Sequence, residues 1–268
     1  MTSVSDDHMP GDGDLTYDVR GDVGWIVFNR PHARNALTFE MYARLAQICN
    51  EADRSSDLRA LVITGAGKAF AAGTDISQFR AFATEQDAYD YEDRGQAVIR
   101  AIEHCGVPTI AAIRGACTGG GAAIAAACDL RIGAPSALFG FPVARTLGNC
   151  LSIGNYARLA AIVGPARVRE MILTARLIEA EEALRIGWLS EVVAGEDQLE
   201  ARAEELAATV AGHAPLTIRA TKMALLRIRD EVPPLHDEDL VSMCYMSDDF
   251  KEGVEAFLGK RRPLWRNR

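Results

Sequence analysis

Three consecutive glycines, Gly119 to Gly121, precede an alanine-rich segment near the middle of this chain of 268 residues. Because glycine has no Cβ, another group can approach the backbone closely at such a place. The alanine-rich segment predicts a short helix, whose first-turn N–H groups lack an intrahelical partner and carry the partial positive charge of the helix dipole. Such a helix start is suited to holding a partial or full oxyanion. Close packing against neighbouring elements explains it equally well.

A second stretch, residues 63–79, has a similar character. A strand-like run ends in glycines, and a loop of small residues leads through Gly73 and Thr74 toward a short helix. The stretch superficially resembles a phosphate-binding loop, but that motif requires Ser or Thr after its lysine, and here Ala69 follows Lys68. The Gly-x-Gly in the same loop is too weak a signal for a dinucleotide site. The spacing therefore excludes nucleotide hydrolysis.

Strand-like and helical patterns alternate along the first two thirds of the chain. Short apolar runs that end in glycine predict buried strands, and apolar residues spaced three to four apart predict amphipathic helices. The predicted strands lie within 15–31 (two strands around a Gly-Asp turn), 59–65, 108–115 and 128–134, and the predicted helices lie within 35–55 and 85–105. This alternation predicts an α/β fold with functional loops at strand ends. From residue 199 onward the pattern is helical only.

Composition excludes several classes of function. The net charge of −8 and pI of about 5.2 argue against a nucleic-acid surface. No apolar run approaches the roughly 18 residues that span a bilayer. The acidic N-terminus is no secretion signal. The six cysteines form no CxxC pair, which indicates reduced thiols, and the five histidines are never near neighbours. We therefore expect a cytoplasmic protein without metal, nucleic-acid or membrane partners.

Taken together and in this order, the two glycine-rich stretches resemble the oxyanion-hole segments of the crotonase (enoyl-CoA hydratase/isomerase) superfamily. Three further segments agree with it: VGWIVFNRPHARNAL, ALFGFPVARTLGNCLSIGNYARL and KEGVEAFLGKRRP. The resemblance covers nearly the whole chain. It implies a crotonase-like spiral of ββα units with a C-terminal helical trimerisation region, an acyl-CoA thioester as substrate, and a homotrimer or a dimer of trimers. No separate cofactor is implied, because coenzyme A is part of the substrate.

The resemblance also divides the chain and assigns the oxyanion hole. Residues 1–14 are expected to form a disordered tail, 15–198 an acyl-CoA-binding core, and 199–268 a helical oligomerisation region. The donors of the oxyanion hole should be the backbone N–H groups of Thr74 and Gly120. Two such donors aimed at the thioester oxygen stabilise an enolate, and losing one typically lowers the rate by about 10²–10³-fold.

The segments that contact CoA in the family have counterparts here. Arg34 and Ala36 fall where the backbone follows the pantetheine and phosphates, and Lys68 and Ala72 fall where the adenine is held. At the C-terminus, the resemblance assigns an aromatic residue of the acyl pocket to Phe257 and a phosphate-binding lysine to Lys260. An ordinary exposed lysine in a basic segment is the alternative for Lys260.

Both glutamates of the family's hydratases are missing from their expected positions. The first position is Ala123 and the second is Val143. Addition of water to a double bond needs a base for the water and an acid for the α-carbon, both within hydrogen-bond reach. Standard two-glutamate hydration is therefore in doubt.

Other residues remain as candidates for the chemistry. Arg145 fits a carboxylate on the acyl group, but a salt bridge elsewhere fits it as well. Cys150 is a possible nucleophile, although no histidine lies near it in sequence, and a buried inert thiol is the simpler interpretation. The charged helix at 85–105 is mostly a solvated face, from which we single out Tyr91 as an inward-facing candidate.

Three functions follow from this resemblance. The leading one is enolate chemistry on an acyl-CoA, as isomerase, decarboxylase or lyase, without the usual glutamate pair. The second is an enoyl-CoA hydratase with its acid and base displaced to another segment. The third is a non-catalytic acyl-CoA-binding protein.

Overall fold

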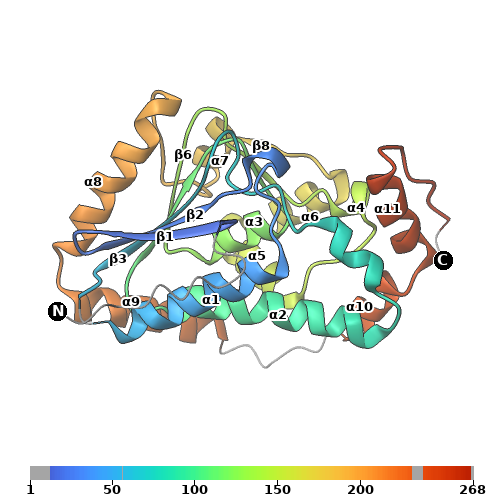
Figure 1. The fold of residues 1–268 in the computed structure, drawn as a ribbon, viewed down its shortest axis with the longest axis horizontal. Helices are drawn as coiled ribbons and strands as arrows, with labels where there is room; N and C mark the ends of the chain where they lie inside the picture. Colours follow the sequence, from blue (N-terminus) through green and yellow to red (C-terminus); the bar gives the residue numbers. More distant parts are fainter. Residues whose placement is uncertain (1–12, 56, 231–237, 267–268) are drawn as a thin grey trace.

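The computed structural model describes residues 13–55, 57–230 and 238–266. Two sheets form its centre (Figure 1). The larger contains β1 (Leu15–Arg20), β2 (Val23–Phe28), β3 (Ala60–Gly65), β4 (Thr109–Ile113), β6 (Leu130–Gly133) and β9 (Glu191–Val192), adjacent in that order. The smaller contains β5 (Ala116–Thr118), β7 (Leu138–Gly140) and β8 (Ile178–Glu179). β1 and β2 form an antiparallel hairpin, and the other neighbours in the large sheet are parallel.

The large sheet is covered by helices on both faces, which is why its central strands are apolar throughout. On β3, Ala60 and Val62 pack toward α8 (Leu199–Ala211), and Leu61 and Ile63 pack into the cluster that includes α1 and α2. The ribbon shows α8 on one side of the sheet, with α1 (Phe39–Arg54) and α2 (Glu85–His104) on the other (Figure 1). α8 therefore packs on the core, although the sequence pattern groups it with the C-terminal helices.

The two long helices begin at capped ends. The Thr38 side chain accepts a hydrogen bond from Met41 N at the start of α1, and Thr84 forms a capping box with Asp87 at the start of α2. Apolar residues at helical spacing then bury one face of each helix. The helices that follow are α3 (Gly120–Ala127), α4 (Val143–Thr146), α5 (Ile153–Val163), α6 (Pro165–Thr174), α7 (Ala180–Arg185), α9 (Pro215–Asp230), α10 (Glu238–Tyr245) and α11 (Asp248–Leu258).

The predicted α/β fold is confirmed, as are all five predicted strands and both predicted long helices. The described residues beyond position 199 form helices and no strand. Four short strands, β5, β7, β8 and β9, were not predicted. The predicted disordered tail lies outside the described residues except for Gly13 and Asp14.

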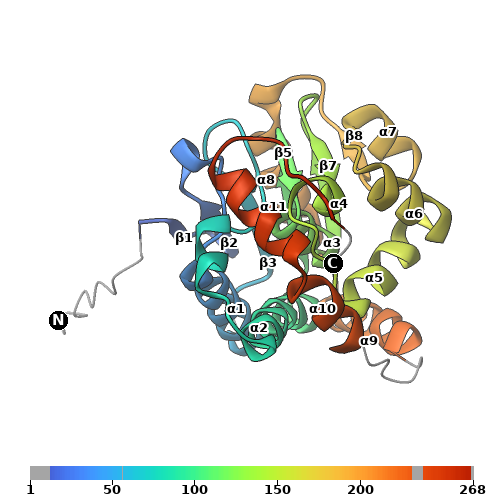
Figure 2. The same cartoon turned by 90° about the vertical axis from the view of Figure 1, so that its right-hand side faces the viewer.

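The end of the chain returns to the middle of the molecule. α10 packs against α2, and α11 packs against α4 and against the 3₁₀ turn Ile76–Ala81 that follows the first glycine-rich loop. Figure 2 shows both helices in front of the region where the glycine-rich loops lie. Aromatic side chains fill the contact, with Tyr245 and Phe250 buried beside Phe79. The C-terminal helices thus close one side of that region.

Candidate active site

The two glycine-rich segments lie next to each other at the carboxyl ends of neighbouring strands. Ala71 N donates to Ala116 O at 3.0 Å, and Thr118 N donates to Ala71 O at 3.0 Å. A Cβ built on Gly119 would lie 3.5 Å from the Cα of Gly73. Both glycines have positive φ, 106° at Gly73 and 52° at Gly119, which side-chain-bearing residues rarely adopt. The backbone conformation of the two loops therefore favours glycine, whereas the space between them would admit a Cβ at ordinary contact distance.

The backbone N–H groups of Thr74 and Gly120 lie on these loops without a hydrogen-bond partner among the described residues. On the far side of the first loop, Leu37 N donates to Gly73 O and Asp75 N donates to Leu37 O, each at 2.8 Å. Gly120 is the first residue of α3, where an N–H has no intrahelical acceptor. Two donors thus remain available to an anionic oxygen.

A cavity of about 150 Å³ lies beside these two donors. It is mostly apolar, and it includes both glycine loops, one face of α2, the segment after β7 and one residue of α11. Its lining residues are Tyr42, Ala72, Gly73, Thr74, Ile76, Phe79, Tyr91, Glu92, Gly95, Gln96, Ile99, Thr118, Gly119, Gly120, Ala123, Phe141, Pro142, Val143, Thr146, Leu147, Asn149, Cys150, Leu151, Asn155 and Phe257. Ala123 and Val143, the two positions to which the family resemblance assigns glutamates, both line this cavity.

A chain of hydroxyl groups runs along one wall of the cavity. Thr74 Oγ1 lies 2.9 Å from Tyr42 Oη and 2.9 Å from Tyr91 Oη. Burial raises the pKa of Tyr42 to about 12 and raises the pKa of Tyr91 well above its ordinary value. Both phenols therefore stay protonated near neutral pH, where they act as hydrogen-bond donors and not as bases.

Glu92 is the only charged side chain among the described residues that line the cavity. Its Oε1 accepts a hydrogen bond from the hydroxyl of Tyr245, which α10 provides, at 2.6 Å. Asn149 Nδ2 in turn donates to that hydroxyl at 3.2 Å. Asn149 Oδ1 is buried and has no hydrogen-bond partner. The Tyr245 hydroxyl thus donates to a carboxylate and accepts from an amide N–H, while the amide oxygen of Asn149 stays without a partner.

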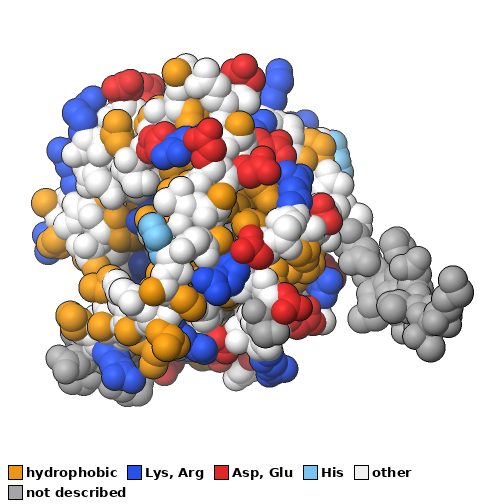
Figure 3. Space-filling model, turned by 90° about the vertical axis from the view of Figure 1, so that its left-hand side faces the viewer, with side chains coloured by type: hydrophobic (Ala, Val, Ile, Leu, Met, Phe, Trp, Pro, Cys, Tyr) orange, Lys and Arg blue, Asp and Glu red, His pale blue; other side chains and the backbone are white. Residues whose placement is uncertain are grey.

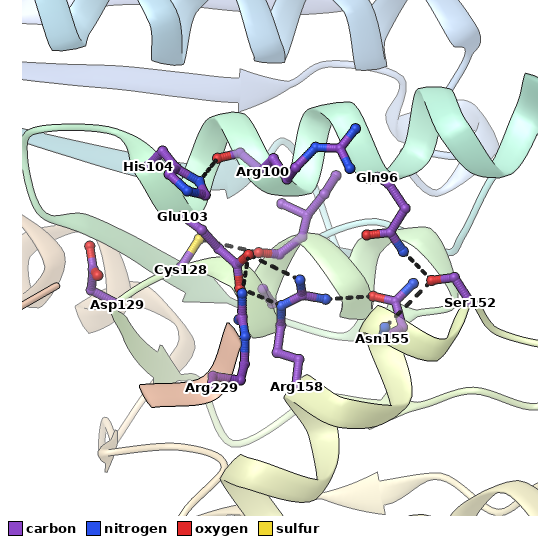
Figure 4. Close-up of polar contacts among 12 residues, drawn as sticks. Gln96, Arg100, Glu103, His104, Cys128, Asp129, Ser152, Asn155, Arg158 and Arg229 are labelled. Carbon is purple, nitrogen blue, oxygen red and sulfur yellow. Dashed lines mark hydrogen bonds and ion pairs between the residues drawn. The ribbon is translucent and has the colours of Figure 1, made fainter. Parts of the chain in front are cut away.

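A buried ion cluster supports another part of the cavity wall (Figure 4). Glu103 of α2 binds Arg158 of α5 through two hydrogen bonds, at 2.6 and 3.1 Å, and also binds Arg229 of α9. Arg158 further donates to Asn155 Oδ1 at 2.8 Å, and Gln96 donates to the Ser152 hydroxyl. Since Gln96 and Asn155 line the cavity, the cluster fixes two of its polar side chains.

The residues assigned to the CoA end lie along one edge of the first loop. Ala72 N donates to Arg34 O at 3.0 Å, which joins these two segments directly. Arg34 and Lys68 have exposed side chains, and Ala36 is half-buried. Between them, the fully buried Asn35 donates to the carbonyl oxygens of Ala66 and Ala69 at 2.9 and 2.7 Å.

The other candidates divide between the cavity and the surface. Tyr91, Cys150 and Phe257 line the cavity, whereas the side chain of Arg145 on α4 is exposed and does not line it. Lys260 is exposed just beyond α11. Cys150 is half-buried, and its hydrogen bond with Cys244 lowers the pKa of the Cys244 thiol to about 7.

Asp75, next to the first donor, has a structural role. It accepts hydrogen bonds from the backbone and hydroxyl of Ser77 and from Arg30. Burial alone would raise the pKa of this carboxyl, but these bonds lower it below its ordinary value. The loop thus uses Asp75 to hold its own geometry.

Four residues of the site were not identified from the sequence: Tyr42, Glu92, Asn149 and Tyr245. For Glu92 a signal existed, because Glu92, Gly95, Gln96 and Ile99 follow the i, i+3, i+4, i+7 spacing of one helix face. For Tyr42 and Tyr245 there was none, since each looks like an ordinary apolar-face aromatic until its hydroxyl partner is known.

Within the described ranges, no group of three or more His, Cys, Asp or Glu side chains is arranged to hold a metal ion. None of the described helices has both the length and the apolar composition needed to cross a membrane.

Comparison with known proteins gives consistent matches. Residues 18–268 match the family model described as enoyl-CoA hydratase/isomerase. The peroxisomal Delta(3,5)-Delta(2,4)-dienoyl-CoA isomerase of Arabidopsis thaliana is 34% identical over 255 residues, which cover 89% of this chain and 90% of that protein. The short-chain-enoyl-CoA hydratase of Clostridium acetobutylicum is 33% identical, with 90% and 93% covered. Among solved structures, methylmalonyl-CoA decarboxylase in complex with 2-nitronate-propionyl-CoA has a TM-score of 0.86 at 27% identity, covering 95% of this chain and 98% of that one.

Proposed function

The chain belongs to the enoyl-CoA hydratase/isomerase family, and from that membership we propose that it stabilises a thioester enolate between the N–H groups of Thr74 and Gly120. Its fold is the crotonase fold, as the sequence predicts. The observation that carries the proposal is the pair of unpartnered N–H groups beside a largely apolar cavity. An acyl-CoA fits this site, because its thioester carbonyl can accept hydrogen bonds from the two N–H groups and its acyl chain is apolar.

The chemistry of an enolate explains why backbone donors suit the reaction. When a proton or a carboxylate leaves the α-carbon, negative charge develops on the thioester oxygen. Two fixed N–H donors stabilise that charge more than the neutral carbonyl of the substrate, so they lower the barrier. Isomerisation, decarboxylation and lyase reactions can all pass through this intermediate, and we propose a reaction of this group.

A displaced-acid hydratase is the second candidate. It is favoured by the similarity to the short-chain-enoyl-CoA hydratase and by the presence of one carboxylate, Glu92, at the cavity. Against it stands the absence of carboxylates at positions 123 and 143, because hydration requires both a base for water and an acid for the α-carbon. A non-catalytic acyl-CoA-binding protein is the third candidate.

For the rest of the ligand, we propose that CoA follows the edge formed by Arg34, Ala36, Lys68 and Ala72, with Lys260 near its phosphates. The exposed cationic side chains among these residues suit phosphate groups. The half-exposed Phe257 would cover the acyl chain from α11. Arg145 remains a candidate partner for an acyl carboxylate only if the chain around α4 moves, because its side chain now points to the surface.

We also propose that the protein works as a homotrimer or a dimer of trimers. α9 exposes Leu216, Leu225 and Ile228, with 78%, 64% and 69% of their surface accessible. Exposed apolar groups on one helix are costly in water and mark an interaction surface.

The deciding test uses three measurements on the unaltered protein. Calorimetry with butyryl-CoA should detect binding, and NMR in deuterated water should detect exchange of the α-protons of butyryl-CoA. Hydration of crotonyl-CoA should be negligible, because acid and base groups each contribute about 10²–10⁴-fold.

Each outcome separates the candidates. Hydration as fast as that of ordinary hydratases would support the second candidate over the first. Binding without exchange would support the non-catalytic protein. Absence of binding at millimolar acyl-CoA would contradict all three.

A further inference from the structure

We propose that Glu92 is the catalytic residue that accepts and returns the proton, and that Tyr245 and Asn149 position its carboxylate. This inference rests on the proposed enolate chemistry and deepens it, because it assigns the base to α2. The positions to which the family resemblance assigns glutamates lie on two other helices, Ala123 on α3 and Val143 at the start of α4.

The first support is the set of side chains that line the cavity. Among its described lining residues, Glu92 is the only carboxylate, and no Lys, Arg or His accompanies it. A group that removes a proton from a carbon acid near neutral pH must be largely deprotonated there. A carboxylate meets that condition, whereas the two phenols at the wall have raised pKa values and hold their protons.

The second support is the face of α2 on which Glu92 lies. Gly95, Gln96 and Ile99 occupy the same face at helical spacing and also line the cavity. The neighbouring Tyr91 reaches Thr74, the residue that provides one oxyanion donor, through a 2.9 Å hydrogen bond. Consecutive residues of one helix therefore contact the oxyanion loop and present a carboxylate to the same cavity.

The third support is the way the carboxylate is held. Tyr245, 1% exposed, donates to Glu92 Oε1 at 2.6 Å, and Asn149 orients that phenol from the opposite segment. A hydroxyl that donates to a carboxylate stabilises its charged form and fixes its direction. This is the arrangement of a base and a residue that orients it.

The proton transfer balances without any further reactant. A Glu92 oxygen forms an O–H bond with the α-proton while the Cα–H bond breaks. The electron pair of that bond becomes the Cα=C bond of the enolate, and the thioester oxygen takes the charge beside Thr74 N and Gly120 N. Glu92 then gives the proton back, either to Cα or to Cγ of a 3-enoyl group. One carboxylate thus suffices to move a double bond.

The key experiment compares Glu92→Gln with Asp93→Asn, an exposed carboxylate on the same helix. The assay is α-proton exchange of butyryl-CoA in deuterated water, with butyryl-CoA affinity measured in parallel. Glu92→Gln should lower exchange by about 10²–10⁴-fold with affinity retained, and Asp93→Asn should exchange normally. Equal exchange by Glu92→Gln and the unaltered protein would overturn the inference and leave the proposed enolate chemistry standing.

A second variant tests the positioning role. Tyr245→Phe removes the hydrogen bond to the carboxylate, so the pKa of Glu92 should rise and the acidic limb of the exchange rate should move to higher pH. Among the described residues, the phenols Tyr42, Tyr91, Tyr156 and Tyr245 sense the charge of Glu92, and burial raises the pKa of each. They stay protonated across this range. If the acidic limb of the exchange rate stays at the same pH in Tyr245→Phe, Tyr245 has no positioning role.

A failure of the proposed function would look different from a failure of this inference. If the unaltered protein binds butyryl-CoA but exchanges no α-proton, the enolate chemistry fails and the assignment of Glu92 fails with it. Turnover of a 3-enoyl-CoA to the 2-enoyl isomer by the unaltered protein, lost in Glu92→Gln, would support both.

Discussion

Gly120 shows how tightly the donor geometry depends on a missing side chain. A Cβ at this position would overlap the Tyr42 hydroxyl and come within 3.1 Å of Thr74 Oγ1. Either the Tyr42 side chain or the first residue of α3, with its N–H, would then have to move. The positions of the Tyr42 hydroxyl and of this N–H thus depend on glycine at position 120.

Gly120→Ala should therefore lower α-proton exchange of butyryl-CoA by about 10²–10³-fold, the typical effect of losing one oxyanion donor. Adding Tyr42→Phe removes the overlapping oxygen and should restore part of the rate. Tyr42→Phe alone is the control. If the double variant is no faster than Gly120→Ala, the overlap with Tyr42 does not set the position of this N–H.

The two proposed donors follow from the sequence, whereas the proposed base does not. Thr74 and Gly120 lie in local motifs, because close approach of two backbones leaves a run of glycines. Glu92 depends on a distant partner: Tyr245 lies 153 positions further along the chain. Nothing local distinguishes it from the neighbouring acids on α2 except its place on the helix face.

Elements α2, α5 and α9 are held together by a buried charge. Side chains of Glu103 and Arg158 are each 5% exposed. Removing one member of such a cluster leaves other charges buried without compensation, which typically costs about 3–5 kcal/mol. The pair between Asp53 and Arg219 of α9, 38% and 49% exposed, is the matched surface case, where a pair contributes about 1 kcal/mol or less.

Glu103→Gln should accordingly lower the free energy of unfolding by about 3 kcal/mol, and Asp53→Asn by less than about 1 kcal/mol. Urea unfolding at one fixed protein concentration measures both. If the two variants lose similar amounts of unfolding free energy, burial does not make the stability of the fold more dependent on Glu103.

The same cluster makes the stability of the fold depend on pH, with a loss of stability at acidic pH. Burial would raise the pKa of Glu103, but hydrogen bonds from Arg229 and Arg158 lower it below its ordinary 4.5. The contribution is therefore fully present above about pH 4.5 and is lost as the pH falls through the lower folded-state value. The stability difference between the unaltered protein and Glu103→Gln should shrink over that acidic range.

Long elements were easier to predict than short ones for a physical reason. β3 and β4 bury every residue except one on β3, so their apolar runs stand out in the sequence. β8 and β9 have two residues each, too few to show any periodicity, and they form because neighbouring strands provide hydrogen-bond partners. α8 differs from both: its sequence pattern clearly predicts a helix, but the pattern does not say against which element the helix packs.

At the scale of the whole molecule, the exposed apolar side chains of α9 are the feature that most needs a partner. Hydrophobic side chains gather along the lower part of the face in Figure 3, where Figure 1 places α9. A second cavity, of about 710 Å³, lies between α9 and the segment Ala126–Arg131, and Leu225 and Ile228 line it. We expect other copies of the chain to cover this region.

Light scattering at micromolar concentration should therefore give the mass of a trimer or a hexamer. Leu225→Glu combined with Ile228→Glu places two charges in the expected contact and should lower that mass. Leu173→Glu on α6, at a more exposed leucine (78%), is the control and should leave the mass unchanged. A monomer of the unaltered protein would refute this expectation.

Because Tyr245 lies 153 positions after Glu92 in the chain, the parts of the site are synthesised in a fixed order. The sheet, both glycine loops and α2 all come from the earlier part of the chain, so during synthesis they can fold before α10 and α11 emerge from the ribosome. A nascent chain at that stage would have its two backbone donors but no phenol to hold Glu92 and no Phe257 over the cavity. On the proposed role of Glu92, the site therefore becomes complete only when α10 and α11 have been made.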